Sequence, residues 1–233
     1  PEHDVLVIGG GLAGMRAGIS AHKAGVDVAI ISKVHPVRSH SNAAQGGINA
    51  ALTIRGDDWT DHAFDTIKGS DYLADQDAVE VMCREAGDEI ISLEHMGVIF
   101  NRDEEGRLGT RSFGGQRKAR TFFVADITGQ AILQVMYEQL LKSQVSVYEE
   151  WFVTSLIVDE GECRGVIALD IRNGQLHVIN AKSVILCGGG LGRVFEPSTN
   201  ALIVTGDAMA LAYQAGAPPV SYTHLTLPTN REV

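Results

Sequence analysis

A short polar segment, Arg38–Gly47, brings together side chains that could act on a bound cofactor. It contains one imidazole, His40, whose ring nitrogen can act as a nucleophile, and it ends in two glycines that let backbone approach a ligand. Hydroxyl and amide groups beside His40 can donate and accept hydrogen bonds; they belong to Ser39, Ser41, Asn42 and Gln45. The segment follows a strand, a glycine loop and a helix at the distance where the ring of a dinucleotide would lie. We therefore expect His40 near a dinucleotide; the alternative is a structural loop histidine.

The elements that must position this segment begin at the first residues of the chain. The apolar run Val5–Ile8 is typical of a buried strand, and glycines with G-x-G-x-x-G spacing follow it directly. The first glycine permits a tight turn, the second lets backbone approach a pyrophosphate, and the third lets helix pack on strand. A helix and a second strand, Val26–Ile31, complete the unit. We predict a dinucleotide-binding loop formed by Gly9, Gly10, Gly11, Leu12, Ala13 and Gly14.

The end of the second strand departs from the usual dinucleotide-binding pattern. An acidic residue normally binds the ribose there, but this chain has Ser32 and Lys33. The serine hydroxyl could still bind a ribose, and the lysine could lie near a phosphate. The departure argues against a generic NAD site.

Composition sets outer bounds on function. The chain has 233 residues, 45% of them hydrophobic, which is enough to bury a sizeable core in one α/β domain. Its net charge of −10 disfavours nucleic acid and anionic lipid as partners. No apolar run has the length of a membrane span. The three cysteines lack C-x-x-C spacing, so we expect no metal site.

The remaining pattern predicts alternating helices and strands with one antiparallel insert. We expect a helix that begins with a capping box at Asp77 and ends near Gly97, a strand at Val98–Phe100, a glycine-rich basic loop over about 101–120, and a helix over about 129–142. Three β-rich runs near 152–158, 164–171 and 175–180 predict an antiparallel meander. A separate parallel strand, Val184–Leu186, then ends in Gly188–Gly190.

Several motifs together resemble one family. The chain resembles the flavoprotein subunits of succinate dehydrogenase and fumarate reductase, a group that also contains L-aspartate oxidase. The matching motifs run in order over residues 4–219: the glycine loop, Ser32–Val34, Arg38–Gly47, Lys68–Tyr72, Glu94–Gly97, Phe113–Gly115 and Thr205–Asp207. The resemblance implies a Rossmann-like FAD-binding domain over residues 1–220, with a parallel sheet and an inserted three-stranded meander, and without the capping domain of the family.

The same resemblance implies a role for His40. In the dehydrogenase and reductase subunits the histidine of this motif is covalently attached to the 8α-methyl of FAD, which raises the flavin potential toward that of the succinate/fumarate couple. L-aspartate oxidase usually lacks the histidine. The resemblance also implies contacts of Asp207 with the flavin, of Phe152–Val153 with adenine and of Phe113 with substrate. Val34, Ala44, Gly46 and Gly47 complete the set of expected cofactor-binding residues, which also includes the glycine loop, Ser32, Lys33 and the polar residues around His40.

The resemblance implies hydride transfer between flavin N5 and succinate or fumarate. The family's proton-shuttling arginine and carboxylate-clamping histidines belong to segments that we do not find in this chain, so we assign no catalytic residue. The basic loop, including Arg117 and Arg120, could attract a dicarboxylate or an acidic partner, although a solvated loop is the commoner explanation. Residues 221–233 depart from the family and look like translated adapter sequence, so we exclude them.

The expected partners are an iron–sulfur subunit and membrane anchor subunits, which would place the protein in the cytoplasm, peripheral at the inner face of the membrane. Two alternatives remain: an enzyme similar to L-aspartate oxidase, which His40 disfavours, and an FAD-binding module without its own catalysis. The physiological direction depends on partners encoded elsewhere.

Overall fold

The computed structural model describes residues 1–217, and these residues form two compact units. The first unit contains Pro1–Asn42 and the chain from Met136 onward, and the second is Ala43–Val135. The boundary falls inside helix α4 (Thr128–Ser143). No helix of the described part is long and apolar enough to cross a membrane. The segment 221–233, expected to be foreign, lies outside the described residues.

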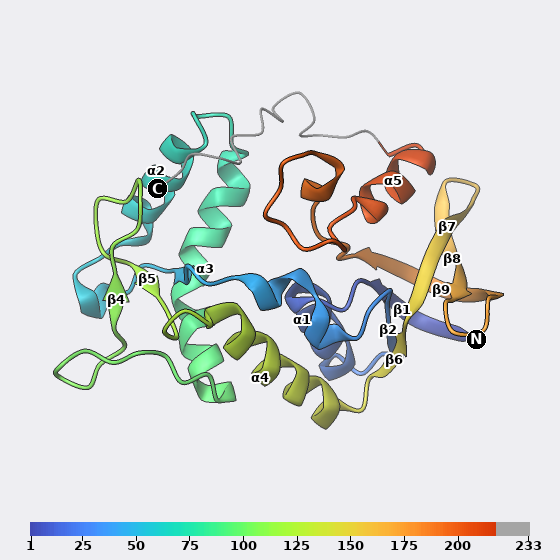
Figure 1. Ribbon diagram of the computed structural model, residues 1–233, viewed down its shortest axis with the longest axis horizontal. Coiled ribbons are helices and arrows are strands. Elements are labelled where there is room, and N and C mark those ends of the chain that lie inside the picture. Colours follow the sequence, from blue (N-terminus) through green and yellow to red (C-terminus); the bar gives the residue numbers. More distant parts are fainter. Residues whose placement is uncertain (218–233) are drawn as a thin grey trace. The chain divides into compact units, whose positions relative to one another are not determined.

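The first unit is built on a six-stranded sheet in the order β6-β2-β1-β9-β8-β7 (Figure 1). Strands β6, β2, β1 and β9 pair in parallel, whereas β9, β8 and β7 pair antiparallel. This is the α/β fold with a parallel sheet and an antiparallel meander that the sequence predicts. The strands are β1 (Glu2–Ile8), β2 (Val28–Ser32), β6 (Ser146–Glu149), β7 (Trp151–Asp159), β8 (Glu162–Asp170) and β9 (Gln175–Leu186). The helices are α1 (Leu12–Lys23) and α5 (Asp207–Gln214), with short 3-10 turns at Pro36–Arg38, His40–Ala43 and Gly192–Val194.

Strand β9 joins the two parts of this sheet. We expected two strands, 175–180 and 184–186, but the chain is one continuous strand of 12 residues. Its first half pairs with β8, where Gln175 lies opposite Asp170, and its second half pairs with β1, where Leu186 lies opposite Ile8. Residues 181–183 carry no glycine or proline to break the strand, so only its partner changes. The meander is therefore an extension of the parallel sheet.

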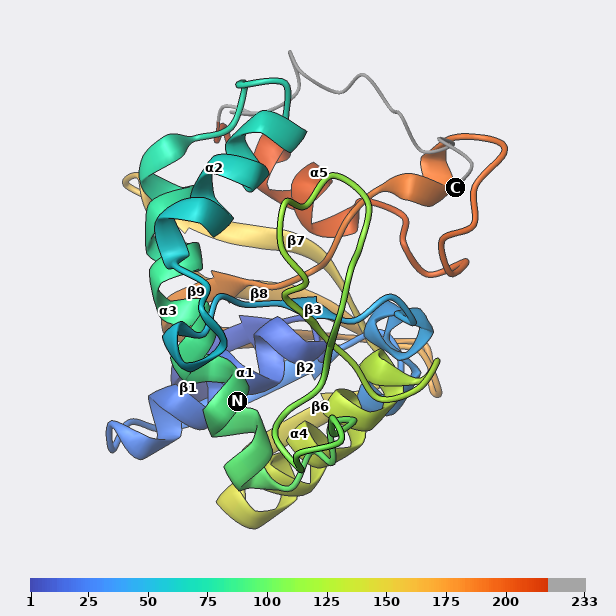
Figure 2. The same cartoon turned by 90° about the vertical axis from the view of Figure 1, so that its left-hand side faces the viewer.

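The two faces of the parallel strands are covered by different elements (Figures 1 and 2). Ile30 faces α1, since a Cβ added to Gly18 would lie 2.8 Å from its Cδ1 atom. The next residue, Ile31, belongs to a buried cluster that includes Ile179 of the meander and Leu211 of α5. Successive strand residues point to opposite faces, so α1 and α5 lie on opposite sides of β2. Their packing leaves the carboxyl ends of β1 and β2 to carry the loops of the site.

The second unit combines two helices with a small sheet. Helices α2 (Trp59–Gly69) and α3 (Gln76–Met96) pack around a buried cluster of Ala63, Val79 and Cys83. The sheet has the order β3-β5-β4 with antiparallel pairing. Its strands are β3 (Ile48–Asn49), β4 (Thr110–Arg111) and β5 (Thr121–Phe122), and a 3-10 turn covers Thr53–Arg55.

Two local predictions in this unit were wrong. Helix α3 begins two residues earlier than expected, because Asp75 rather than Asp77 caps it: the Asp75 carboxylate accepts a hydrogen bond from the Ala78 N–H at 3.2 Å. The segment 98–100 is not a strand. Its N–H at Val98 bonds back to the Leu93 carbonyl at 3.0 Å, and Val98 and Phe100 are only 2% and 1% exposed. Burial, rather than sheet pairing, accounts for Val98 and Phe100, whereas Ile99 between them is 82% exposed.

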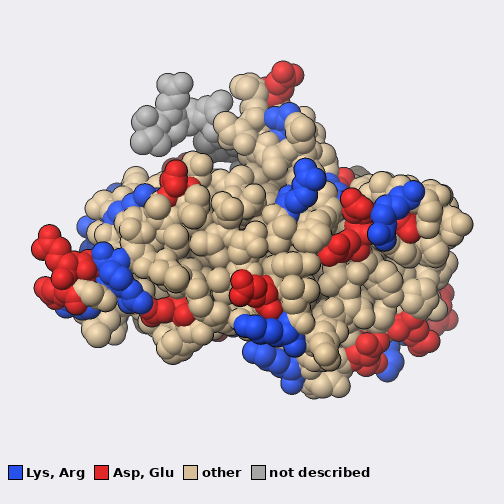
Figure 3. All heavy atoms as spheres, turned by 60° about the horizontal axis from the view of Figure 1, so that its bottom comes forward, with Lys and Arg blue, Asp and Glu red and all other residues tan. Residues whose placement is uncertain are grey.

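Acidic and basic side chains lie next to one another over the face drawn in Figure 3. Surface ion pairs such as Arg164–Glu162 and Lys182–Asp4, both at 2.6 Å, follow the same pattern. Pairs of this exposure typically contribute about 0–1 kcal/mol each. The stability of the fold therefore comes mainly from the buried clusters.

Candidate functional site

The glycine loop lies at the carboxyl end of β1, where backbone packs directly on backbone. Gly9 has a φ of +113°, and an added Cβ would overlap the Cys187 carbonyl that follows β9. A Cβ on Gly14 would overlap the Gly9 carbonyl oxygen. Only glycine fits these two positions, in agreement with the turn and the helix–strand approach expected from the motif.

The amino terminus of α1 is suited to bind an anion. Its N-cap residue, Gly11, has no side chain that could cap the helix, and its first turn holds no acidic residue. The first N–H groups of a helix have no partner within the helix, and they carry partial positive charge. A pyrophosphate would satisfy both properties.

Two hydroxyls of the Arg38–Gly47 segment lie beside this helix terminus. A Cβ built on Gly11 would be 3.6 Å from Ser41 Oγ and 3.7 Å from Ser39 Oγ. The Ser39 Oγ atom is buried and has no hydrogen-bond partner among the described residues. A buried hydroxyl without a partner is costly, so a ligand atom at this position would remove a penalty. These residues therefore fit a bound dinucleotide.

Ser32, at the end of β2, is 5% exposed and donates its hydroxyl proton to the Val34 carbonyl at 2.6 Å. The oxygen can then only accept a hydrogen bond from a ribose hydroxyl. Gly10 lies directly against it, since an added Cβ would be 2.8 Å from Ser32 Oγ. The contact with the ribose stays a prediction, in which the ribose hydroxyl donates and Ser32 accepts the hydrogen bond.

The charge of Lys33 is paired within the protein. Its ammonium lies 2.5 Å from Asp207 Oδ2 and 2.8 Å from Thr205 Oγ1, so it joins the end of β2 to the start of α5. Asp207 is the first residue of α5, and the N-cap is Gly206, with a φ of +76°. Asp207 is therefore held by Lys33 and Thr205 rather than acting as the helix cap. This pairing was not predicted, because no local sequence pattern links residues so far apart.

His40 begins a 3-10 turn and makes one hydrogen bond within the described residues. Its Nδ1 atom accepts the backbone N–H of Ala201 at 3.3 Å. Asn42, two residues later, is exposed and bonds through its N–H to the Ser39 carbonyl at 3.0 Å. The partner of His40 was not foreseen either, since a backbone donor has no sequence signature.

Phe152 and Val153 lie on β7, as expected. Val153 is 6% exposed and belongs to the buried cluster of the first unit. Phe152 is partly buried and pairs with Leu169 of β8. The Val153 side chain belongs to the core, so its contact with adenine would have to involve backbone. The adenine contact of both residues stays a prediction.

The other predicted residues lie in the second unit. The Ala44 carbonyl accepts the Gly129 N–H at 2.7 Å. Gly47 has a φ of +117°, and an added Cβ would lie 2.5 Å from the Phe122 carbonyl. A Cβ on Gly46 would lie 3.3 Å from the ring of Phe113, which is 52% exposed. Gly47 is thus required by its backbone conformation and its contact with Phe122, and Gly46 packs closely on the Phe113 ring.

The neighbouring Arg111 bonds to the backbone of the same segment. Its guanidinium donates to the carbonyl of Gln45 at 2.9 Å and to that of Gly46 at 3.1 Å. Because Gly46 also packs on the Phe113 ring, the loop that carries Phe113 is attached to the glycine pair at two points. The substrate contact of Phe113 stays a prediction.

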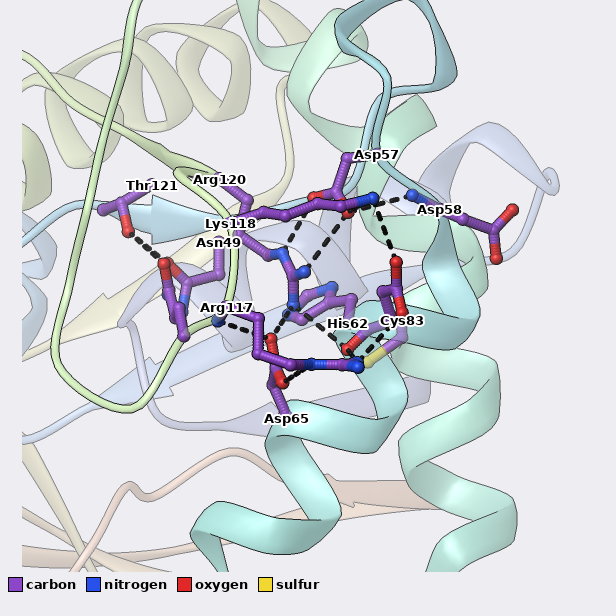
Figure 4. A network of polar contacts seen from close by, with 12 residues as sticks. Asn49, Asp57, Asp58, His62, Asp65, Cys83, Arg117, Lys118, Arg120 and Thr121 are labelled. Carbon is purple, nitrogen blue, oxygen red and sulfur yellow. Dashed lines mark hydrogen bonds and ion pairs between the residues drawn. The ribbon is translucent and has the colours of Figure 1, made fainter.

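The basic loop proves to be paired with acidic residues of α2 and the turn before it (Figure 4). Arg117 lies 2.7 Å from Asp65, and Lys118 lies 3.0 Å from Asp61. Arg107, nearer the start of the loop, pairs with Asp103 at 3.5 Å. The positive charges of this loop are largely neutralised by carboxylates of the same unit. They therefore give no support to the expected attraction of a dicarboxylate.

Arg120 is the buried centre of this network. It is 1% exposed and binds Asp57 at 2.8 Å and Asp65 at 2.9 Å, both nearly buried. His62 lies beside it, 4% exposed, with an Nδ1 atom that has no partner in the described residues. Burial lowers the pKa of His62 below its ordinary 6.5, and the Arg120 charge lowers it further, against the opposing carboxylates. His62 is therefore neutral in the folded protein at pH 7.

No group of three or more possible metal-ligating side chains occurs among residues 1–217. The site is thus defined by a glycine loop, a helix terminus and the polar segment around His40, which together are typical of a flavin dinucleotide-binding domain. Comparison with known proteins identifies the class: a model of the FAD binding domain matches residues 4–229, and the chain belongs to this family.

The relatives within this class are flavoprotein subunits. The chain is 49% identical over 220 residues to a fumarate reductase flavoprotein subunit of Mycobacterium tuberculosis, covering 93% of this chain and 38% of the relative. It is 47% identical over 226 residues to a succinate dehydrogenase flavoprotein subunit of Rickettsia bellii, with the same coverage. The resemblance predicted from the motifs is confirmed. The chain spans about 38% of the length of these relatives.

Solved structures agree with this assignment. The E. coli quinol fumarate reductase superposes with a TM-score of 0.89 at 37% identity, covering 92% of this chain and 37% of that one. A Mycobacterium smegmatis Sdh1 complex superposes with a TM-score of 0.88 at 32% identity, covering 92% of this chain and 39% of that one. The α/β flavoprotein fold is therefore confirmed.

Replacement of Arg120 by alanine should strongly destabilise the protein, because it leaves Asp57 and Asp65 buried without a cation. We expect a loss of about 3–5 kcal/mol in the free energy of unfolding, measured in urea. Arg102→Ala, which removes an exposed pair with Glu94, is the matched control, with an expected loss below about 1 kcal/mol. Equal losses for the two variants would show that the buried network does not have this role.

The neutral state of His62 predicts a pH dependence of stability. The unfolded chain binds a proton at this residue near pH 6.5, whereas the folded chain does so only at lower pH, so the free energy of unfolding should fall as pH decreases below about 6.5. His62→Gln should remove this component. The test is urea unfolding of the wild type and His62→Gln at several pH values between 7.5 and 5. If the free energy of unfolding depends on pH in the same way for both proteins, the pKa of His62 is not lowered.

Proposed function

We propose that this chain is the FAD-binding part of a flavoprotein subunit that interconverts succinate and fumarate, with FAD covalently attached at His40. The observation that carries the proposal is the position of the residues flanking His40: Ser39 and Ser41 lie beside Gly11 at the anion-binding terminus of α1. A flavin dinucleotide bound at that terminus has its pyrophosphate next to the segment that holds the imidazole. The 49% identity to a fumarate reductase flavoprotein subunit supports the same substrate pair.

Each element of the chain then has a defined task. The glycine loop and the amino terminus of α1 bind the pyrophosphate, and the Ser39 hydroxyl gains the partner that it lacks. Ser32 accepts a hydrogen bond from the ribose, and Lys33 holds Asp207 at the start of α5. The cofactor supplies hydride transfer to and from the dicarboxylate, and the protein supplies its binding and orientation.

The covalent attachment has a defined balance of atoms. His40 would form a C–N bond from a ring nitrogen to the 8α-methyl carbon, with loss of one methyl hydrogen and of the imidazole N–H proton. This attachment is a two-electron oxidation, for which molecular oxygen would be the final acceptor, with hydrogen peroxide as the product.

Electrons from the flavin pass, in this proposal, to an iron–sulfur subunit and membrane anchor subunits at the inner, cytoplasmic face of the membrane. Similar solved structures include a quinol–fumarate reductase with menaquinol molecules and an Sdh1 complex with UQ1, which supports a quinone as the other reactant. The residues that clamp the carboxylates and shuttle the proton lie outside these 233 residues.

Replacement of His40 by serine tests the attachment. The wild-type protein, as this chain and as the longer gene product proposed here, should show flavin fluorescence that stays with its band in denaturing electrophoresis, and His40→Ser should abolish it. His22→Ser, an exposed change on α1, is the matched control and should keep it. A wild-type band that binds FAD but loses it on denaturation would instead favour an enzyme similar to L-aspartate oxidase.

The isolated chain should not oxidise succinate. With FAD bound and an artificial electron acceptor supplied, we expect no rate above the protein-free background, because no residue of this chain is assigned to proton transfer from the substrate. The longer gene product serves as the positive control. Turnover by the 233-residue chain would show that the catalytic residues had been assigned to the wrong part of the protein.

A further inference from the structure

The segment that follows β9 makes a specific contact with His40. The backbone N–H of Ala201 donates to His40 Nδ1 at 3.3 Å, and no other hydrogen bond to this ring is present in residues 1–217. Both residues belong to the first unit, but 161 positions separate them. A backbone N–H can only donate, so the Nδ1 atom that faces it must carry a lone pair.

This constraint decides the protonation of the ring. A neutral imidazole holds its single proton on one of its two nitrogens. With Nδ1 as acceptor, the proton of neutral His40 lies on Nε2, and the ring orientation is set by the direction of the Ala201 N–H. A ring held in one orientation loses less freedom when it reacts, which is a recognised contribution to rate.

The donor is itself held in place by the turn 190–204. The guanidinium of Arg193 donates to the Ser198 carbonyl at 2.9 Å, and its backbone N–H bonds to the Val204 carbonyl at 3.0 Å. The Val204 N–H in turn bonds to the Ala201 carbonyl at 3.0 Å. Arg193 thus binds the backbone on both sides of Ala201, at Ser198 and at Val204.

Asn200, next to Ala201, packs tightly in the same turn. Its N–H bonds to Ser198 Oγ at 3.2 Å. Its side-chain amide lies so close to Gly192 that a Cβ added there would be 2.5 Å from Oδ1. The position of Ala201 is therefore determined by the packing of Asn200 and by the hydrogen bond from the Val204 N–H.

We propose that the Ala201 N–H, positioned by Arg193, orients His40 for attachment of the flavin. The inference rests on the covalent linkage proposed above and adds two positioning groups to it. Because Nδ1 is hydrogen-bonded to the Ala201 N–H, the nitrogen that attaches would be Nε2, which gives up its proton as the C–N bond forms. Neither group touches Nε2: Ala201 acts through the His40 ring, and Arg193 acts through the turn. Their removal should slow the attachment while leaving the pyrophosphate site at α1 intact.

The experiment compares variants by the ratio of covalent to total bound FAD over time after addition of FAD. Ala201→Pro removes the N–H donor, and the matched Ala201→Gly keeps it. We expect Ala201→Pro to slow attachment about fivefold, the equivalent of one hydrogen bond, with noncovalent FAD still bound. Arg193→Ala should slow it in the same direction, whereas Arg164→Ala, which removes an exposed pair with Glu162, should not. Wild-type rates in both Ala201→Pro and Arg193→Ala would overturn the proposal.

A second measurement does not depend on attachment. In protein labelled with 15N-histidine, the ring signals of His40, identified by their loss in His40→Ser, should show the proton on Nε2 in the wild type and in Ala201→Gly, and a shifted tautomer balance in Arg193→Ala. A wild-type ring protonated on Nδ1 would overturn the inference. If the wild type never links FAD but shows the expected tautomer, the covalent linkage fails and the orientation of His40 by Ala201 stands.

Discussion

Close backbone packing at the carboxyl end of β1 is the constraint on which the site depends. Gly9 lies against the Cys187 carbonyl after β9, and Gly14 lies against the Gly9 carbonyl, so strand, loop and helix meet with no side chain between them. A methyl group at either position would separate α1 from the sheet. The helix terminus would then no longer face the hydroxyls of Ser39 and Ser41, and the anion-binding geometry would be lost.

Electrostatic interactions within each unit follow one rule: the cations that could serve a ligand are mostly bound to carboxylates of the protein. Lys33 holds Asp207, and Arg120 binds two buried aspartates. A buried cation with two carboxylates is tolerated only because each charge is paired and hydrogen-bonded. In the proposed site, a pyrophosphate would be bound by backbone N–H groups and hydroxyls rather than by a cationic side chain.

Local patterns predicted the elements better than their ends or their partners. The glycine spacing, the alternation of helices and strands, and the meander were all read correctly. The run 98–100 was assigned to a strand because burial and sheet pairing produce the same apolar pattern. Strand β9 was divided in two because sequence reports extended conformation but not the neighbour with which each half pairs.

The sequence alone determined the class of protein, because a glycine loop after a strand, together with ordered motifs, needs only neighbours along the chain. It also singled out His40 as a possible flavin attachment site. Only the tertiary structure decided which groups surround these residues. Ala201 at His40, Thr205 at Lys33 and the aspartates at Arg120 are joined through folding, across 55 to 172 positions. Backbone donors and charge pairs at such separations have no periodic signature, so their geometry exists only once the sheet and the turns bring them together.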